Sequence, residues 1–358
     1  MVAAGASRDE AAAVRPGEAL DVERLDAWLK ARVPELSGTP RITQYRGGAS
    51  NWTYRLEYEG RDLILRRPPA GTKARSAHDM GREFRIQQAL RPVYPYVPRM
   101  LAHCADEAVV GAEFYVMERL DGLILRRDLP PGVTLTPRLA GELCRRALDV
   151  LIALHRVDVE AAGLAWIGKG AGYVRRQVEG WSERYRKART WNVPRGERIM
   201  AWLSAHLPAR ERLCVTHNDF RFDNLVLDRQ DPTRILGVLD WELATLGDPW
   251  MDLGNALAYW VERDDDFFGR AIRRQPTHLP GMLTRHEVVD YYAERTGERP
   301  ESFTFYEVFG LFRLAVIAQQ IYFRYHRRET RNPAYRRFWL FVHYLHRRCA
   351  KALRRSSD

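Results

Sequence analysis

The pattern of hydrophobic and polar residues divides the chain into a strand-rich part and a helix-rich part. Up to about residue 120, apolar residues gather in short runs that are rich in β-branched and aromatic side chains, as is typical of strands. These runs cover residues 41–45, 52–58, 62–67, 100–104 and 114–118. Between the third and fourth runs, residues 77–90 carry apolar side chains at helical spacing, which predicts a helix.

Beyond residue 121 the apolar residues recur mainly with the helical period. The helix candidates cover residues 137–155, 173–191, 251–260, 287–296, 303–323 and 334–353. An island of three short strand candidates interrupts them, at residues 213–216, 225–227 and 235–239. Residues 1–19 are Ala-rich and charged, and we expect a disordered leader there. The pattern therefore predicts an α+β chain with a β-rich lobe at 20–120 and a mainly helical lobe at 121–358.

Composition narrows the choice of partners. The 358 residues are 46% hydrophobic, which is enough for two cores, and the net charge of +11 favours acidic partners, although a solvated basic surface explains it equally well. No helix-turn-helix, zinc-finger or RNA-recognition signature is present, so no nucleic acid is expected. The start lacks a signal peptide, and no apolar run reaches the ~18 residues of a membrane span. We therefore expect a soluble, cytoplasmic protein without a membrane partner.

The strand island contains the strongest candidates for chemistry. Its first strand leads into His217-Asn218-Asp219, Asn224 lies five positions after that Asp, and its last strand ends at Asp240. Phosphoryl transfer needs a carboxylate that accepts the proton of the attacking hydroxyl, and cations that neutralise the phosphate oxygens. Mg²⁺ is usually held by one or two protein oxygens together with phosphates and waters. This loop and the following strand supply both kinds of group.

The sequence H-x-D-x-x-x-x-N followed by Asp-Trp-Glu resembles the protein-kinase signature and, more closely, that of the aminoglycoside phosphotransferase and choline kinase family. The resemblance implies a protein-kinase-like two-lobed fold and an ATP- and Mg²⁺-dependent transfer of the γ-phosphate to a hydroxyl of a small molecule. By this resemblance Asp219 is the catalytic base and His217 braces the loop. Asn224 and Asp240 are the implied Mg²⁺ ligands. The family usually has Gly where this chain has Asn218, a residue that tolerates left-handed backbone.

A turn between the first two strand candidates is a candidate phosphate-binding loop. Its backbone N–H groups could cover phosphates, although a hairpin with two glycines needs no ligand. The candidate residues in this turn are Gly47, Gly48, Ser50 and Asn51.

The resemblance also assigns nucleotide-binding roles to other residues of the β-rich lobe. In kinases the third strand carries a Lys that grips the phosphates and pairs with a Glu on the next helix. Arg66 occupies the Lys position here, and Glu83 lies in the helix candidate that follows. Arg binds phosphate bidentately but is not interchangeable with Lys. Glu118 and Leu120 belong to the implied hinge whose backbone meets adenine; ATP is the expected nucleotide, and GTP is not excluded.

One subgroup of the family, in which Arg replaces the strand Lys, is resembled by the segments 47–51, 65–69, 76–78, 82–85 and 114–118 taken together. This subgroup is the phosphotransferase domain that in some proteins is fused to an acyl-CoA dehydrogenase, and the resemblance runs from about residue 40 to 350. It implies the hydroxyl of a hydroxyacyl-CoA as the acceptor. The wider family phosphorylates aminoglycosides, choline, homoserine or macrolides.

Residues 173–191 form a basic helix candidate interleaved with aromatic residues, with six Lys or Arg against two Glu. We expect Arg175, Arg176 and Arg184 to bind an anionic acceptor, and we assign Glu242 of the Asp-Trp-Glu triplet to the acceptor as well. A helix with its arginines in water accounts for the same pattern.

Other functions stay open at this point. One is a kinase of aminoglycosides or other antibiotics. Another is a catalytically silent kinase-fold protein that binds nucleotide, which only the Arg66 substitution supports. Nucleic-acid binding is suggested by charge alone, and the sequence does not indicate an oligomeric state.

Overall fold

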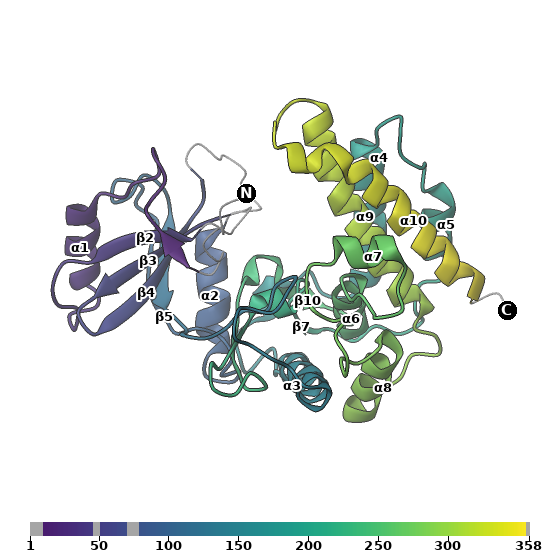
Figure 1. Cartoon of the computed structure of the whole chain (residues 1–358), viewed down its shortest axis with the longest axis horizontal. Coiled ribbons are helices and arrows are strands. Elements are labelled where there is room, and N and C mark those ends of the chain that lie inside the picture. Colours follow the sequence, from purple (N-terminus) through teal and green to yellow (C-terminus); the bar gives the residue numbers. More distant parts are fainter. Residues whose placement is uncertain (1–9, 46–50, 70–78, 356–358) are drawn as a thin grey trace. The chain divides into compact units, whose positions relative to one another are not determined.

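The computed structural model describes residues 10–45, 51–69 and 79–355. The chain falls into two compact units, Met1–Ile124 with Leu225–Glu242 and Leu125–Asn224 with Leu243–Asp358. Large strands characterise the first unit, and long helices characterise the second (Figure 1). The chain leaves the first unit close to the predicted boundary at residue 120, but it returns for a hairpin that the sequence pattern had placed with the helical part.

The first unit is built on a six-stranded antiparallel sheet with the strand order β1-β2-β3-β4-β6-β5. Its strands are β1 (Ala11–Ala12), β2 (Arg41–Tyr45), β3 (Trp52–Tyr58), β4 (Arg61–Arg67), β5 (Met100–Cys104) and β6 (Phe114–Glu118). All five predicted strands of this part are present. Along β3 the buried residues alternate with partly exposed ones, as expected of a strand with one face on a core.

Two helices accompany this sheet, and each begins at an Asp that caps it. They are α1 (Val22–Lys30), capped by Asp21, and α2 (Met80–Leu90), capped by Asp79. Leu25 and Leu29 of α1 join the larger core cluster, which includes Leu63 and Leu65 of β4. Met80 of α2 belongs to a separate cluster with Ile64, Tyr115 and Met117. Because successive strand residues point to opposite faces, the two clusters lie on the two sides of the sheet.

The predicted disordered leader is wrong for residues 10–19. Ala11 and Ala12 form β1 and pair with the edge of β2. The backbone carbonyl of Glu18 accepts hydrogen bonds from the Tyr54 hydroxyl at 2.7 Å and from Nη2 of Arg67 at 3.0 Å. These bonds tie the segment to the sheet. Residues 1–9 lie outside the described part of the chain.

The predicted strand island is divided between the two units. A hairpin of β8 (Leu225–Leu227) and β9 (Ile235–Val238) belongs to the first unit. Leu227 exchanges two backbone hydrogen bonds of 2.7 Å with Leu123, and the backbone N–H of Val238 donates to the carbonyl of Tyr96 at 2.6 Å. In the second unit, β7 (Cys214–Thr216) pairs with β10 (Thr245–Gly247), a strand that the sequence pattern did not predict.

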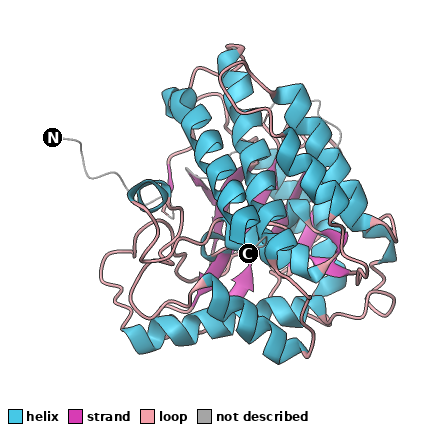
Figure 2. Cartoon of the chain, turned by 90° about the vertical axis from the view of Figure 1, so that its right-hand side faces the viewer, coloured by secondary structure: helices cyan, strands magenta, loops and turns pink. Residues whose placement is uncertain are grey.

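The second unit is mainly helical, as predicted (Figure 2). Its helices are α3 (Pro137–His155), α4 (Tyr173–Ala188), α5 (Glu197–Ala205), α6 (Pro249–Ala258), α7 (Phe267–Ile272), α8 (Arg285–Thr296), α9 (Thr304–His326) and α10 (Phe338–Arg355). Short 3₁₀ turns occur at Ala165–Ile167, Phe222–Asn224, Trp241–Leu243 and Pro333–Arg337. Within the described residues, no helix combines the length and the apolar composition that crossing a membrane requires.

Helix α9 is the centre of the second unit and packs against α4, α5, α6 and α10. Two glycines allow α6 and α9 to approach closely. A Cβ atom on Gly310 would lie only 2.1 Å from the carbonyl oxygen of Gly254, and one on Gly254 would lie 2.5 Å from that of Tyr306. The backbones of α6 and α9 are therefore in direct contact at this crossing, which fixes the position of α9 along α6.

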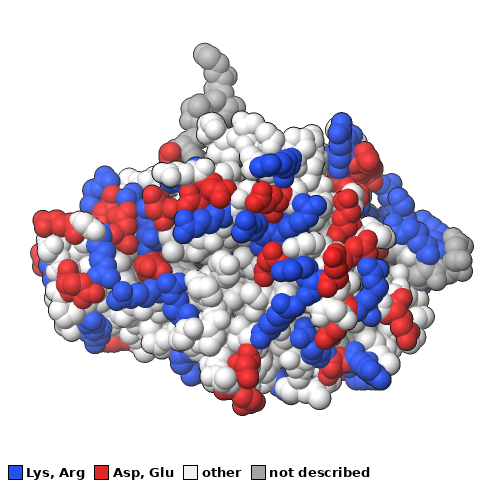
Figure 3. All heavy atoms as spheres, turned by 90° about the horizontal axis from the view of Figure 1, so that it is seen from below, with Lys and Arg blue, Asp and Glu red and all other residues white. Residues whose placement is uncertain are grey.

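Charged side chains of both signs are interspersed on the face drawn in Figure 3. Independently of this view, Arg285 of α8 forms ion pairs with Glu262 at 3.0 Å and Asp265 at 2.7 Å. On this face the net positive charge is therefore not gathered into one basic patch, and a role for an arginine has to be argued from its own surroundings.

Candidate active site

The H-x-D-x-x-x-x-N segment lies in the second unit, directly after β7. The His217 ring is buried, and its Nδ1 accepts a hydrogen bond of 3.2 Å from the backbone N–H of Asp219. The amide nitrogen of Asn224 donates to the backbone carbonyl of Asp219 at 2.8 Å and to its Oδ2 at 3.0 Å. The structure thus brings these three predicted residues together in one short loop.

Asn218 has the left-handed backbone that the usual family glycine would adopt, with φ of 63°. Its buried side chain is also fully used. The amide nitrogen donates to Oγ1 of Thr216 at 3.0 Å and to the carbonyl of Leu243 at 3.2 Å. Its oxygen accepts from Asn255 at 3.1 Å and from the Tyr173 hydroxyl at 3.4 Å. The exchange of Gly for Asn therefore adds four side-chain hydrogen bonds to the loop.

A buried carboxylate in α6 anchors the loop from below. Asp252 accepts hydrogen bonds of 2.7 Å from the backbone N–H groups of both His217 and Asn218, and one of 3.1 Å from Nε2 of His155. Burial works against ionisation of Asp252, but the hydrogen bond from His155 and the charges of His155 and His217 outweigh it and lower its pKa. An ionised Asp252 with three donors holds the loop in place.

The carboxylate of Asp219 is held by two side chains of its own loop. Besides Asn224, Nη2 of Arg221 contacts its Oδ2 at 3.1 Å. The Arg221 guanidinium also lies over the ring of Tyr259, 4.4 Å from its centre. About one sixth of the Asp219 side chain, 17%, is exposed. A carboxylate that is oriented but still accessible is the arrangement that a general base requires.

We predict that Asp252→Asn destabilises the protein by about 3–5 kcal/mol at neutral pH, because an amide cannot accept from two backbone N–H groups and a histidine at once. The loss should shrink as the pH falls below ~4. The lowered pKa of Asp252 means that its contribution is present above the carboxyl pKa of the unfolded chain and disappears when the folded carboxylate is protonated. Urea unfolding at several pH values measures this.

Asp248→Asn is the matched control for that experiment. Asp248 is the buried N-cap residue of the same helix, and its side chain accepts a hydrogen bond of 3.0 Å from the backbone N–H of Met251. Asn caps helices as well as Asp does, so this variant should lose less than about 1 kcal/mol. Equal losses in the two variants would contradict the anchoring role of Asp252.

In the first unit, Arg66 lies between two carboxylates. Its Nη1 contacts Oε1 of Glu83 at 2.5 Å, and its Nη2 contacts Oδ1 of Asp240 at 3.0 Å. The Tyr115 hydroxyl donates to the same Glu83 oxygen at 2.8 Å. Burial opposes the charge of Arg66, but Glu83, Tyr115 and Asp240 outweigh it and hold its pKa well above the ordinary value. Arg67 points to the opposite face, where it bonds to Tyr54 at 3.0 Å, so it belongs to the core of the unit.

Asp240 also has left-handed backbone, with φ of 71°. The next residue explains how this conformation is held. Trp241 is fully buried, its Nε1 donates to the carbonyl of Val238 at 2.9 Å, and its ring meets the Tyr94 ring edge-on at 6.0 Å. Among the described non-glycine residues, only Asn218, Asp240 and Arg328 have positive φ. Two of the three, Asn218 and Asp240, belong to the predicted motifs. This agrees with a functional role, because strained backbone clusters at functional sites.

The remaining candidates of the first unit are partly described. Asn51 is buried, and its amide nitrogen lies 3.4 Å from Oε2 of Glu242. A predicted nucleotide residue thus meets a predicted acceptor residue. Gly47, Gly48 and Ser50 lie outside the described residues.

At the predicted hinge, two backbone N–H groups are used within the protein. That of Glu118 donates to Arg99 at 2.9 Å, and that of Arg119 donates to Asp62 at 3.2 Å. The backbone of Leu120 takes part in no hydrogen bond with the described residues. The hinge residue that stays available to a ligand through its N–H is therefore Leu120.

The three arginines predicted to bind the acceptor do not converge. All lie on α4, where Val174, Val178 and Tyr185 are among the buried residues. Arg175 is exposed. Arg176 donates to the carbonyls of Gly170, at 2.7 Å, and Ala171, so it closes its own loop. Arg184 is exposed as well and stacks on Trp181 at 4.6 Å.

Comparison with known proteins decides the family. The model of the phosphotransferase enzyme family matches residues 41–287, more than half of the chain. The chain belongs to this family. The enzyme class expected from the sequence, a phosphotransferase of small molecules, is thereby confirmed at the level of the family.

Relatives of this phosphotransferase support the expected subgroup and fold. It is 37% identical over 314 residues to acyl-CoA dehydrogenase family member 10 from Mus musculus, which covers 87% of this chain and 29% of that protein. A solved structure from Ralstonia eutropha, whose name proposes an aminoglycoside phosphotransferase, is 30% identical with a TM-score of 0.80, covering 94% of this chain and 99% of that one. The α+β, protein-kinase-like fold is confirmed. The phosphotransferase spans 29% to 41% of the length of the curated relatives it matches.

A more distant structure shows the fold alone. It is the GDP complex of an aminoglycoside 2′-phosphotransferase, which is 16% identical with a TM-score of 0.60 and covers 92% of this phosphotransferase and 99% of its own chain.

The groups available for Mg²⁺ fit that ion by their chemistry. Asp240 offers a carboxylate that is 34% exposed, and the amide nitrogen of Asn224 faces Asp219, which turns its oxygen away. Both are hard oxygen donors, as Mg²⁺ prefers. In the part of the phosphotransferase that the structure describes, no group of three or more His, Cys, Asp or Glu could hold a metal by itself.

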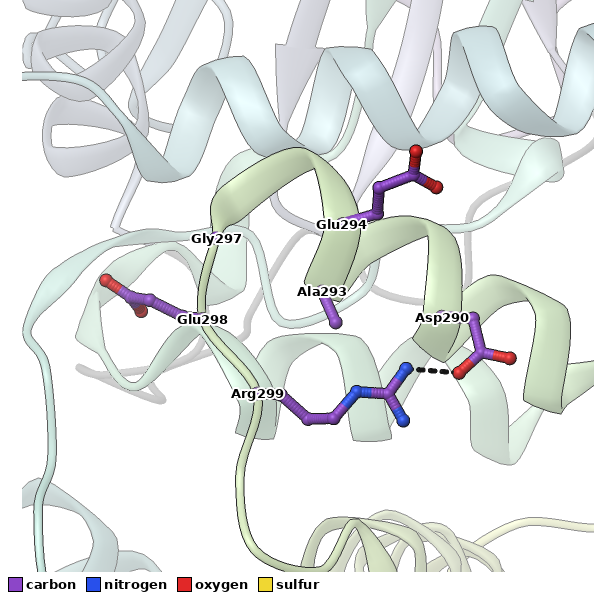
Figure 4. Close-up of a pocket in the computed structure, with 6 residues that line it drawn as sticks. All are labelled: Asp290, Ala293, Glu294, Gly297, Glu298 and Arg299. Atoms are coloured by element: carbon purple, nitrogen blue, oxygen red, sulfur yellow. Dashed lines mark hydrogen bonds and ion pairs between the residues drawn. The ribbon is translucent and has the colours of Figure 1, made fainter.

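A surface pocket at the end of α8 contains none of the predicted site residues (Figure 4). Arg299 turns toward Asp290 and pairs with it, while Glu294 and Glu298 point away from that pair (Figure 4). The pocket charges are thus partly matched among themselves, and the pocket does not change the assignment of the site.

Proposed function

We propose that this phosphotransferase is an ATP- and Mg²⁺-dependent kinase that phosphorylates the hydroxyl of a hydroxyacyl-CoA. The observation that carries the proposal is the loop at 217–224, in which Asp219 is oriented by Asn224 and Arg221 while its side chain stays accessible. The acceptor oxygen would attack the γ-phosphorus, its proton would pass to Asp219, and ADP would leave.

Other residues would bind and position the nucleotide. Leu120 would meet adenine through its backbone N–H. Asn224 and Asp240 would hold Mg²⁺, which when bound neutralises charge on the phosphates. Arg66, which contacts both Glu83 and Asp240, would take the place of the usual Lys, and its second nitrogen reaches far enough to order Asp240 directly. GTP stays an alternative donor.

Charge supports an anionic acceptor over a polycationic one. Arg186 pairs with Glu197 at 2.7 Å and Lys187 with Glu183 at 2.6 Å, which leaves α4 with an excess of positive groups. Such a surface repels aminoglycosides and attracts the phosphates of CoA. The acyl-CoA dehydrogenase name of the Mus musculus relative agrees with this choice.

The test is an assay of ATP consumption with 3- and 4-hydroxyacyl-CoA, their free hydroxy acids, and kanamycin-type aminoglycosides. We expect turnover with the CoA esters, with the phosphorylated product identified by mass spectrometry and ³¹P NMR. Efficient phosphorylation of aminoglycosides would contradict the acceptor. Nucleotide binding without turnover on any acceptor would instead support the catalytically silent alternative.

A further inference from the structure

Arg313 is a buried arginine of α9 without an anionic partner. It and Arg67 are each only 5% exposed, and these are the two buried arginines in the described part of the chain. Arg67 is bonded to Tyr54, to the carbonyl of Val110 and to that of Glu18. Across the described residues, by contrast, the side chain of Arg313 forms neither a hydrogen bond nor an ion pair.

The surroundings of Arg313 are aromatic. Its guanidinium lies 5.2 Å from the centre of the Trp181 ring of α4. Two tyrosines are close enough to feel its charge. Burial raises the pKa of Tyr173 and of Tyr259, and the charge of Arg313 acts in the opposite direction on both. Aromatic faces stabilise a guanidinium partly, but they do not replace its lost hydration.

Both tyrosines also contact the candidate catalytic loop. The Tyr173 hydroxyl lies 3.4 Å from Oδ1 of Asn218. The Tyr259 ring lies under Arg221, whose Nη2 is 3.1 Å from Asp219. Arg313 and the loop belong to the same compact unit, and the charge of Arg313 acts on two tyrosines that contact the loop.

An uncompensated buried cation is unfavourable, because burial removes its hydration and no carboxylate repays the loss. Such a residue persists where a bound ligand supplies the anion. A guanidinium is well suited to this, since its fork matches carboxylate and phosphate groups with two parallel hydrogen bonds.

We propose that Arg313 binds an anionic group of the acceptor, a carboxylate or a phosphate, and so selects acceptors that carry one. The assignment of the anion to the acceptor rests on the proposed function, whereas the anion site itself does not. It also replaces Arg175, Arg176 and Arg184 as the main source of acceptor selectivity, since those three are exposed or tied to their own loop.

The experiment compares the full-length wild type with Arg313→Met and with Arg324→Met. Arg324 is an exposed arginine of the same helix, so its variant controls for the loss of one positive charge on α9. Calorimetry measures the binding of three probes: inorganic phosphate, 4-hydroxybutyrate and 4-hydroxybutyryl-CoA. The first two separate phosphate from carboxylate recognition, and the third tests the complete CoA ester.

For at least one probe we expect Arg313→Met to weaken binding on the order of 30-fold or more, as truncation of a buried charged partner does. Arg324→Met should bind that probe like the wild type. The affinity for nucleotide should be unchanged in both variants. The melting temperature of Arg313→Met should stay the same or rise, because an unpaired buried charge has been removed.

Three outcomes would overturn the inference: unchanged binding of all probes in Arg313→Met, no binding of any probe to the wild type, or a fall in melting temperature without a change in binding. Failure of the proposed function looks different. A wild type that binds an anionic probe through Arg313 but never consumes ATP would refute the kinase and keep the anion site. Equal phosphorylation of the acceptors by the wild type and by Arg313→Met would keep the kinase and refute the anion site.

Discussion

Replacing Asp219 with Asn should lower turnover by roughly 10²–10⁴-fold while nucleotide affinity and stability stay close to those of the wild type. Asn has nearly the same shape as Asp, so it can still accept from Asn224, which donates to Oδ2 of Asp219 at 3.0 Å. What it cannot do is accept the proton of the acceptor hydroxyl. Single-turnover kinetics with saturating Mg·ATP measures the chemical step, and calorimetry measures nucleotide affinity.

Asp223→Asn is the matched control for Asp219→Asn. Asp223 lies in the same loop and contacts the same arginine, with 3.3 Å between its Oδ1 and Nε of Arg221, and both carboxylates have similar exposure. It occupies one of the unspecified positions of the H-x-D-x-x-x-x-N motif. Turnover in this variant should fall by less than about tenfold, which is the loss expected from a small shift of the loop. Equal losses in the two variants would mean that the pairing with Arg221, and not a base at position 219, is what the reaction needs.

The sequence was sufficient for elements that carry a full period of their own pattern. The strand at 52–58 and the helix at 137–155 have the bounds that were predicted, because each buries one regular face. β1 and β10 were missed. They have two and three residues, too few for any alternation to be visible, and they exist because a longer or neighbouring strand offers backbone partners.

Residues that act through sequence-distant contacts could not be found in the same way. Asp252 was not among the residues assigned to the site from the sequence, yet it anchors the loop more than thirty positions before it. Nothing in the local sequence of Asp252 distinguishes an anchoring role from a capping role, since Asp248 and Asp252 are both buried carboxylates near the start of α6. Arg313 is similar, because an Arg within the apolar part of a long helix reveals neither its burial nor its missing partner. The exposure of Arg175, in contrast, was accessible from the spacing of Val174, Val178 and Tyr185.

The two positive-φ residues of the motifs also bear on how the variants should be designed. Asn218 shows that this chain already accommodates Asn in left-handed backbone, at φ of 63°. Asp240 has φ of 71°, where Ala would add backbone strain to the loss of the carboxylate. Asn is therefore the informative replacement at position 240, since it removes the charge and keeps the backbone.

Asp240→Asn should weaken the Mg²⁺-dependent binding of ATP by about 10- to 100-fold or more, because an amide is a poorer ligand for a hard cation than a carboxylate is. Binding of ATP without Mg²⁺ should change little. The unfolding free energy should fall by less than about 1 kcal/mol, since Asp240 is one-third exposed, at 34%, and Arg66 keeps its contact with Glu83. Calorimetric titrations of ATP at several Mg²⁺ concentrations separate these effects.

Glu35→Gln is the control for that titration, because Glu35 is another carboxylate of the first unit that pairs with an arginine, 2.8 Å from Nη1 of Arg61, and it lies on the surface. Its variant should bind Mg·ATP like the wild type. The alternative to metal binding is that Asp240 only holds Arg66 for the phosphates. In that case Asp240→Asn would weaken ATP binding equally with and without Mg²⁺, and its metal requirement would match that of the wild type. Only a loss confined to the Mg²⁺-dependent part of the affinity supports Asp240 as the ligand, because Arg66 attracts the phosphates whether or not a metal accompanies them.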